Sequence, residues 1–128
     1  MLERVISWVN RLPAEARTLP IIEHAGRYWS PNEILTQIQS CPNCSLSQAL
    51  QAMLEQRLHA LSPYATQYEI AKTRLIIHFT RTPGYYHTLA GTISTSQLAQ
   101  EVANETPLGQ QLIQIEMQRM REQLEMFS

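Results

Sequence analysis

Three short signatures that each begin a helix place the strongest constraint on the fold of this chain. Ser30–Glu33, Ser45–Gln48 and Ser94–Gln97 all match the pattern Ser-x-x-Glu/Gln. In such a capping box the serine side chain accepts a hydrogen bond from the backbone three residues later, and the Glu or Gln side chain binds the serine N–H. Aliphatic residues follow each signature at three- and four-residue steps, which gives each segment one apolar helical face. The pattern therefore predicts a mainly helical chain.

The expected elements follow from this periodicity and from the prolines. Helices are predicted over residues 2–12, 31–40 and 46–61, between Ser94 and Thr106, and from Leu108 nearly to the end. Residues 74–81 and 85–89 are rich in β-branched and aromatic side chains, and we favour a β-hairpin there. The alternative is a helix from Tyr64 to Phe79, because helical spacing would place five apolar side chains on one face: Tyr64, Tyr68, Ala71, Leu75 and Phe79.

The expected fold is α+β and mainly helical, with about five helices and a small two-stranded β-hairpin. A chain of 128 residues is too short for two independent cores of ordinary size, so a single domain over residues 1–128 is predicted. A helix, a turn, a helix and then a hairpin is the order of a winged helix, which makes the middle of the chain winged-helix-like. The predicted core consists of Val5, Val9, Ile34, Ile38, Leu50, Met53, Leu54, Leu58, Leu75, Ile77, Leu98, Val102, Leu112 and Ile115.

Two stretches of the chain resemble each other. AGRYWSPNEILTQI begins at Ala25 and AGTISTSQLAQEV begins at Ala90. Both contain Ala-Gly, a short β-like step, a capping box and aliphatic residues at the same spacing. The similarity indicates either an old duplication or the features that most helix starts share.

The balance of charge removes several classes of function. Ten basic and eleven acidic residues give a net charge of −1, so nothing attracts the whole chain to nucleic acid or to anionic lipid. All acidic residues are Glu, and the four glycines are too far apart to form a phosphate-binding loop. We find neither a Gly-x-Ser-x-Gly elbow nor a carboxylate pair. We therefore expect no enzymatic activity and no cofactor.

A cytoplasmic location is expected from two further features. No apolar run approaches the roughly 20 residues of a membrane span. The first residues also interleave charged and apolar side chains, unlike a signal peptide.

Cys41 and Cys44 form the one Cys-x-x-Cys motif. We expect a plain turn with two free thiols. A zinc site would need two more ligands, and the histidines lack the spacing of a zinc finger, so no metal site is predicted. A redox pair needs a thiol at the start of a helix, whereas Ser45 is the expected cap and both sulfurs would precede the helix. Zinc binding and a thiol oxidoreductase stay open as alternatives.

The carboxyl-terminal helix carries the strongest signal for interaction with another protein. One seam at the spacing of a coiled coil contains Ile113, Met117, Met120, Leu124 and Phe127. Methionines adapt to irregular surfaces, and the nearby hairpin adds the aromatic side chains of Tyr85 and Tyr86. We therefore expect a non-catalytic adaptor, assembly factor, chaperone or regulatory subunit that binds a protein partner, or a second copy of itself, through these seven residues.

The alternative function is that of a winged-helix DNA-binding transcriptional regulator. Ser47, Gln48 and Gln51 would then read base edges, and Arg57, Arg74 and Arg81 would contact phosphates. The helix predicted over residues 46–61 has few basic residues, whereas DNA-binding modules usually concentrate them on one face. Nucleic acid is therefore the less favoured partner.

Overall fold

The computed structural model describes residues 1–56 and 63–127. This part of the chain is α+β and mainly helical, as predicted, and two small antiparallel hairpins accompany its helices. In chain order the elements are α1 (Leu2–Arg11), the 3-10 helix η1 (Ala16–Thr18), β1 (Ile22–His24), β2 (Arg27–Trp29), α2 (Pro31–Ser40), α3 (Ser45–Gln56), α4 (Tyr64–Arg81), β3 (Tyr85–Thr88), β4 (Gly91–Ser94), α5 (Thr95–Ala103) and α6 (Pro107–Glu125).

The predicted strand over residues 74–81 is wrong, because this segment is the second half of the 18-residue helix α4. Ile70, Ala71, Leu75 and Phe79 lie on the buried face of the helix. Burial of that face outweighs the preference of β-branched residues for strands, which depends strongly on context. The strand Tyr85–Thr88 instead pairs with Gly91–Ser94. In the part of the chain that the structure describes, α4 and not a hairpin is the next element after α3, which differs from the element order of a winged helix.

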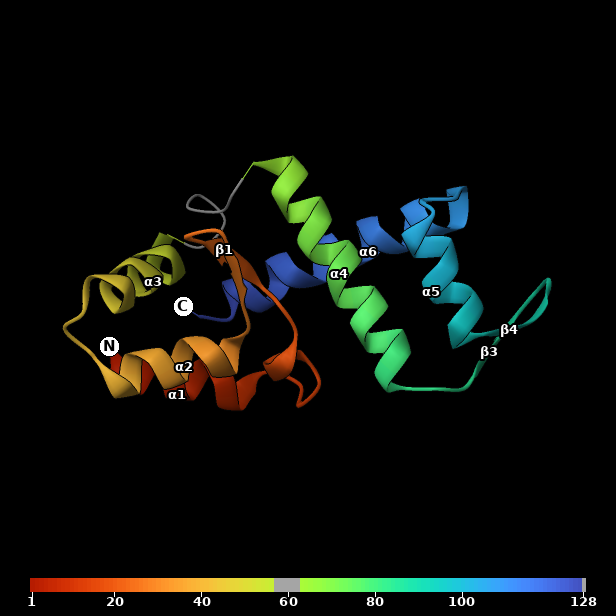
Figure 1. Cartoon of the computed structure of the whole chain (residues 1–128). Helices are drawn as coiled ribbons and strands as arrows, with labels where there is room; N and C mark the ends of the chain where they lie inside the picture. Colours follow the sequence, from red (N-terminus) through yellow and green to blue (C-terminus); the bar gives the residue numbers. More distant parts are fainter. Residues whose placement is uncertain (57–62, 128) are drawn as a thin grey trace.

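The two halves of the chain repeat one order of elements: a helix, a hairpin and two more helices. In Figure 1, α1, α2 and α3 lie at one end of the molecule, α5 and the β3–β4 hairpin lie at the other, and α4 crosses the middle. The resemblance between the stretches at Ala25 and Ala90 thus corresponds to two local structures of the same kind. Ile34 and Leu98 occupy equivalent buried positions after the two capping boxes.

Local chemistry explains where these hairpins and helices begin. Ala25 and Gly26 both have positive φ, at 56° and 74°, as a tight two-residue hairpin turn requires. At the start of α2, Ser30 accepts a hydrogen bond from the Glu33 backbone while the Glu33 side chain accepts one from Ser30. Ser94 and Gln97 repeat this capping box at α5. Both of these predicted helix starts are confirmed.

Helix α6 joins two clusters of buried apolar side chains. One cluster lies between α4, α5 and the first part of α6. The other contains α1, the first hairpin, α2 and α3, together with Leu124 and Phe127 from the end of the chain. Trp8 donates a hydrogen bond from Nε1 to the Gln123 carbonyl at 2.7 Å, and its ring meets Phe127 edge to face at 5.8 Å. The far end of α6 therefore completes the core of the amino-terminal half.

Most of the predicted core is buried, with exceptions on α3, α4 and α6. The confirmed residues are Val5, Val9, Ile34, Ile38, Leu50, Leu54, Leu75, Leu98 and Val102. Met53, Ile77 and Leu112 are only half-buried, and Leu58 lies outside the described residues. Ile115 is the clear error, since 55 % of it is exposed.

Candidate functional site

The seam on α6 is part of the core and does not form an exposed surface. Its five side chains, Ile113, Met117, Met120, Leu124 and Phe127, are each at most 2 % exposed. The chain itself covers them, because α4 and α5 pack on the first part of the seam and α1 packs on its end. The expectation that these residues receive a partner is therefore wrong for the folded chain. Tyr85 and Tyr86, in contrast, lie on the surface at 74 % and 44 % exposure.

A different face of α6 is open and lines a groove of about 900 Å³. Leu108, Leu112 and Ile115 form one wall, and Leu75 and Phe79 of α4 lie across from them. The β3–β4 hairpin forms a third side through Tyr86, Leu89 and Ile93, among others. Leu89 is fully exposed at the hairpin turn, and Leu108 and Ile115 are also exposed. Several large apolar side chains thus face solvent around one concavity, which marks candidate interaction sites on proteins.

The base of the hairpin is anchored while its turn extends into solvent (Figure 1). The Gly84 N–H donates to Thr95 Oγ1 at 3.1 Å, and the Thr95 N–H donates back to the Gly84 carbonyl at 3.0 Å. Tyr86 meets Phe79 of α4 edge to face, with ring centroids 6.1 Å apart. These contacts hold the aromatic strand beside the groove.

A buried ion pair joins α4 to α6 beside the groove. Arg74 Nε donates to Glu116 Oε1 at 3.1 Å, and the two side chains are 1 % and 6 % exposed. The guanidinium also donates to the Pro20 carbonyl at 2.9 Å and to Gln123 Oε1 at 3.0 Å. Burial lowers the pKa of Arg74, and the Glu116 charge opposes that shift. Because each of its nitrogens has an acceptor, Arg74 fixes α4, α6 and the segment before β1 relative to one another.

The groove carries little negative charge. Glu116 is the one acidic side chain among the described residues that line it, and Arg74 already neutralises that carboxylate. Arg119 also contacts Glu116, at 3.3 Å, but its side chain is 61 % exposed. The other ionisable side chains of the lining are His78, Tyr86 and His87. The rim near Arg119 therefore has an excess of positive charge over an otherwise apolar surface.

The residues assigned to DNA contacts do not form one surface. Ser47 and Arg74 are buried, so neither reaches a base edge or a phosphate. Gln48 is exposed and Gln51 is half-buried on α3. Arg81 donates to Thr18 Oγ1 at 2.9 Å, and Arg57 lies outside the described residues.

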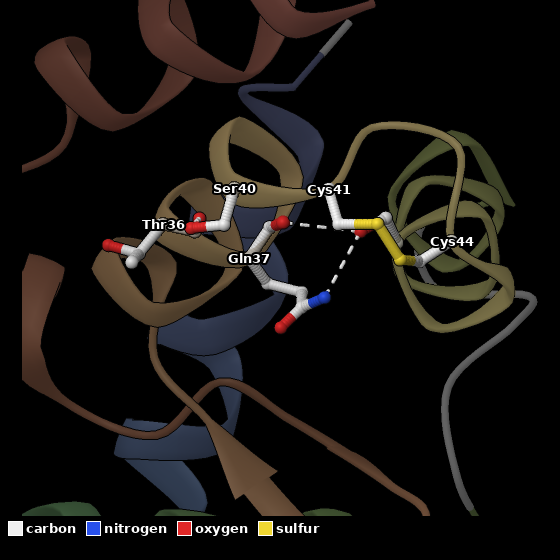
Figure 2. Close-up of a disulfide and its surroundings, with 6 residues drawn as sticks. Thr36, Gln37, Ser40, Cys41 and Cys44 are labelled. Atoms are coloured by element: carbon white, nitrogen blue, oxygen red, sulfur yellow. Dashed lines mark hydrogen bonds between the residues drawn. A yellow bond between two sulfur atoms is a disulfide. The ribbon is translucent and has the colours of Figure 1, made fainter.

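Cys41 and Cys44 form a disulfide, so the expectation of two free thiols is wrong. The bond closes the short turn between α2 and α3, beside Thr36, Gln37 and Ser40 of α2 (Figure 2). Their Cα atoms are 5.5 Å apart, within the range that a disulfide spans without backbone movement. Both cysteines are half-buried, and Pro42 and Asn43 between them are exposed. The turn that carries the bond is thus partly exposed to solvent.

The predicted cap of α3 is also wrong by one residue. The helix begins at Ser45, and the Gln48 N–H donates to the carbonyl of Cys44 at 3.0 Å. The residue whose carbonyl accepts the first hydrogen bond of a helix occupies the N-cap. Cys44, not Ser45, is therefore the N-cap of α3. The sequence does not reveal this, because Ser45–Gln48 itself matches the capping-box pattern and so indicates Ser45 as the cap.

Over residues 1–56 and 63–127, no group of three or more His, Cys, Asp or Glu side chains is arranged to hold a metal ion. The helices in the same ranges lack the length and apolar character needed to cross a membrane. Comparisons of the chain with protein-family models, with curated proteins and with solved structures found no match.

Proposed function

We propose that this protein is a non-catalytic interaction module, an adaptor, assembly factor or regulatory subunit, that binds an amphipathic segment of a partner protein in the groove between α4, α6 and the β3–β4 hairpin. The observation that carries the proposal is the set of exposed apolar side chains around that groove, above all Leu89, Leu108 and Ile115. Interaction through the last helix and the aromatic hairpin stays part of the proposal, but on the face of α6 opposite to the predicted seam.

The charge of the rim favours one kind of occupant. Glu116 is the acidic side chain beside Arg119 in the lining, and Arg74 already neutralises its carboxylate. The positive charge of Arg119 is therefore left unbalanced there. An occupant with an apolar face and an acidic side chain beside it would match both features. A second copy of this chain and a basic segment are the competing occupants. The cytoplasmic location stays a prediction.

The test is direct binding between purified proteins. Candidate partners are captured from the native host, purified, and titrated against wild-type protein and three variants: Leu89→Ser, Ile115→Ser and Arg119→Glu. Full burial of a leucine stabilises a complex by about 1.5–3 kcal/mol, so Leu89→Ser should weaken binding roughly 10- to 100-fold. Ile115 is already partly buried in the free protein, so Ile115→Ser should cost about half as much binding free energy as Leu89→Ser. Arg119→Glu should weaken binding and remove part of its salt dependence.

Tyr64→Ser is the matched control, since Tyr64 is 55 % exposed but does not line the groove. Its affinity should equal that of wild type, and circular dichroism should show the same fold for every variant. Unchanged affinity in all three groove variants would refute the proposal. So would dimerisation of the wild-type chain that the Leu89 and Ile115 variants abolish, because the occupant would then be a second copy.

A further inference from the structure

We infer that Cys41 and Cys44 form an exchangeable disulfide that accepts two electrons from an external dithiol, with Cys41 as the attacked sulfur and Cys44 as the leaving thiolate. This activity is separate from the groove. The motif lies between α2 and α3, in the half of the molecule away from the β3–β4 hairpin (Figure 1).

The position of Cys44 carries the inference. Cys44 occupies the N-cap of the 12-residue helix α3, next to first-turn backbone N–H groups that lack intrahelical acceptors. The helix dipole adds positive potential at the same place, and together these effects lower the pKa of a thiol. The first turn of α3 has no acidic residue to oppose them. Cys44 is therefore the better leaving group of the pair.

Access to the bond is the second requirement. Cys41 is half-buried, and its neighbours Ser40 and Pro42 are exposed. Figure 2 shows the disulfide at the turn where α2 ends and α3 begins. The turn that carries the disulfide is thus partly exposed, as attack by an external thiolate requires.

The third requirement is that the fold tolerates the reduced state. The contact between α2 and α3 does not depend on the sulfurs, because Ser47 Oγ donates to the Gln37 carbonyl at 3.2 Å and Gln37 Nε2 lies 3.3 Å from Ser47 Oγ. The Cys44 N–H also donates to the Cys41 carbonyl at 3.3 Å and closes the turn. The chain has no other cysteine, so within one molecule each thiol can form a disulfide only with the other.

The reaction balances in two exchange steps. One thiolate of the dithiol attacks Cys41 Sγ, the Cys41–Cys44 bond breaks, and Cys44 leaves as a thiolate. The second thiol of the substrate, as its thiolate, then attacks the substrate sulfur of the mixed disulfide and releases Cys41. The substrate is oxidised to its disulfide, and the protein takes up two electrons and two protons as a dithiol.

The first experiment measures the reactivity of each thiol. Cys41→Ser leaves Cys44 alone, and Cys44→Ser leaves Cys41 alone. Alkylation by iodoacetamide across a pH series should show a lower thiol pKa at Cys44 than at Cys41. Below both pKa values, Cys44 should react roughly threefold faster for a pKa lower by about one, because the gain in thiolate fraction is partly offset by the weaker nucleophilicity of that thiolate. Equal pH profiles with an ordinary thiol pKa would overturn the assignment of Cys44 as leaving group.

The second experiment follows exchange in the wild-type chain with dithiothreitol and with glutathione redox buffers as probes. Mass spectrometry of alkylated samples should show both oxidised and reduced protein across the glutathione series, and circular dichroism should show the same helical fold in both states. A disulfide that stays fully oxidised throughout that series would be structural and would overturn the inference. Unfolding on reduction would overturn it as well.

Discussion

The ion pair between Arg74 and Glu116 gives the sharpest quantitative prediction. Glu116→Leu would leave the Arg74 guanidinium 1 % exposed, with two neutral acceptors and no counter-charge. Removing one partner of a buried pair costs about 3–5 kcal/mol. Unfolding entropy scales to about 0.27 kcal/mol/K for 128 residues, so a loss of about 4 kcal/mol should lower the Tm by roughly 15 °C.

The double variant Arg74→Met/Glu116→Leu should recover part of that loss. It buries no charge, but it leaves the Pro20 carbonyl and the Gln123 amide without their donor, which costs about 1–3 kcal/mol. Urea unfolding of the wild type, both single variants and the double variant measures the coupling, which should exceed about 3 kcal/mol. If Glu116→Leu alone costs less than about 1 kcal/mol, the pair is not the buried contact described above.

Two further predictions concern α6 and α2. At Gly109 a Cβ would lie 2.0 Å from the Glu101 carbonyl oxygen, so Gly109→Ala should force α5 and α6 apart and cost at least about 2 kcal/mol in urea unfolding. Gly84→Ala, which meets open space, is the control, and equal costs would contradict the close approach. Partial burial alone would raise the pKa of Glu33, but hydrogen bonds from Ser30 and Arg27 hold that pKa below 4.5. The stability from Glu33 is therefore complete above pH 4.5 and is lost as the pH falls through the lower folded-state pKa. Urea unfolding at neutral pH and at about pH 3 should show less acid sensitivity for Glu33→Gln than for wild type, and an equal acid effect would count against these hydrogen bonds.

The fold class and two of the three capping boxes could be predicted because they depend on local patterns. Ser30 and Ser94 begin helices through contacts within three residues, and Ile34 and Leu98 follow at helical spacing. Local patterns fail where a charged side chain lies on a buried face. Arg74 occupies the inner face of α4, so the apolar stripe is interrupted and the β-branched residues after it suggest a strand.

The candidate site was only partly predictable for a related reason. Periodicity shows that α6 has a wide apolar surface, but it does not show which side the rest of the chain covers. That choice depends on α1, which packs on Leu124 and Phe127 from the other end of the sequence. The periodicity therefore predicts Ile115 as a core residue, although it is exposed and lines the open groove.

The contact between α1 and the end of α6 also has a consequence for the order of folding. Trp8 and Gln123 are 115 positions apart, whereas the contacts among α4, α5 and α6 are much closer in sequence. Pairings over long separations form slowly because a large loop must close first. During synthesis, the ring of Trp8 has no Phe127 to pack against until the last turn of α6 leaves the ribosome. Completion of the amino-terminal core is therefore a late step of folding, because it waits for Leu124 and Phe127 at the far end of the chain.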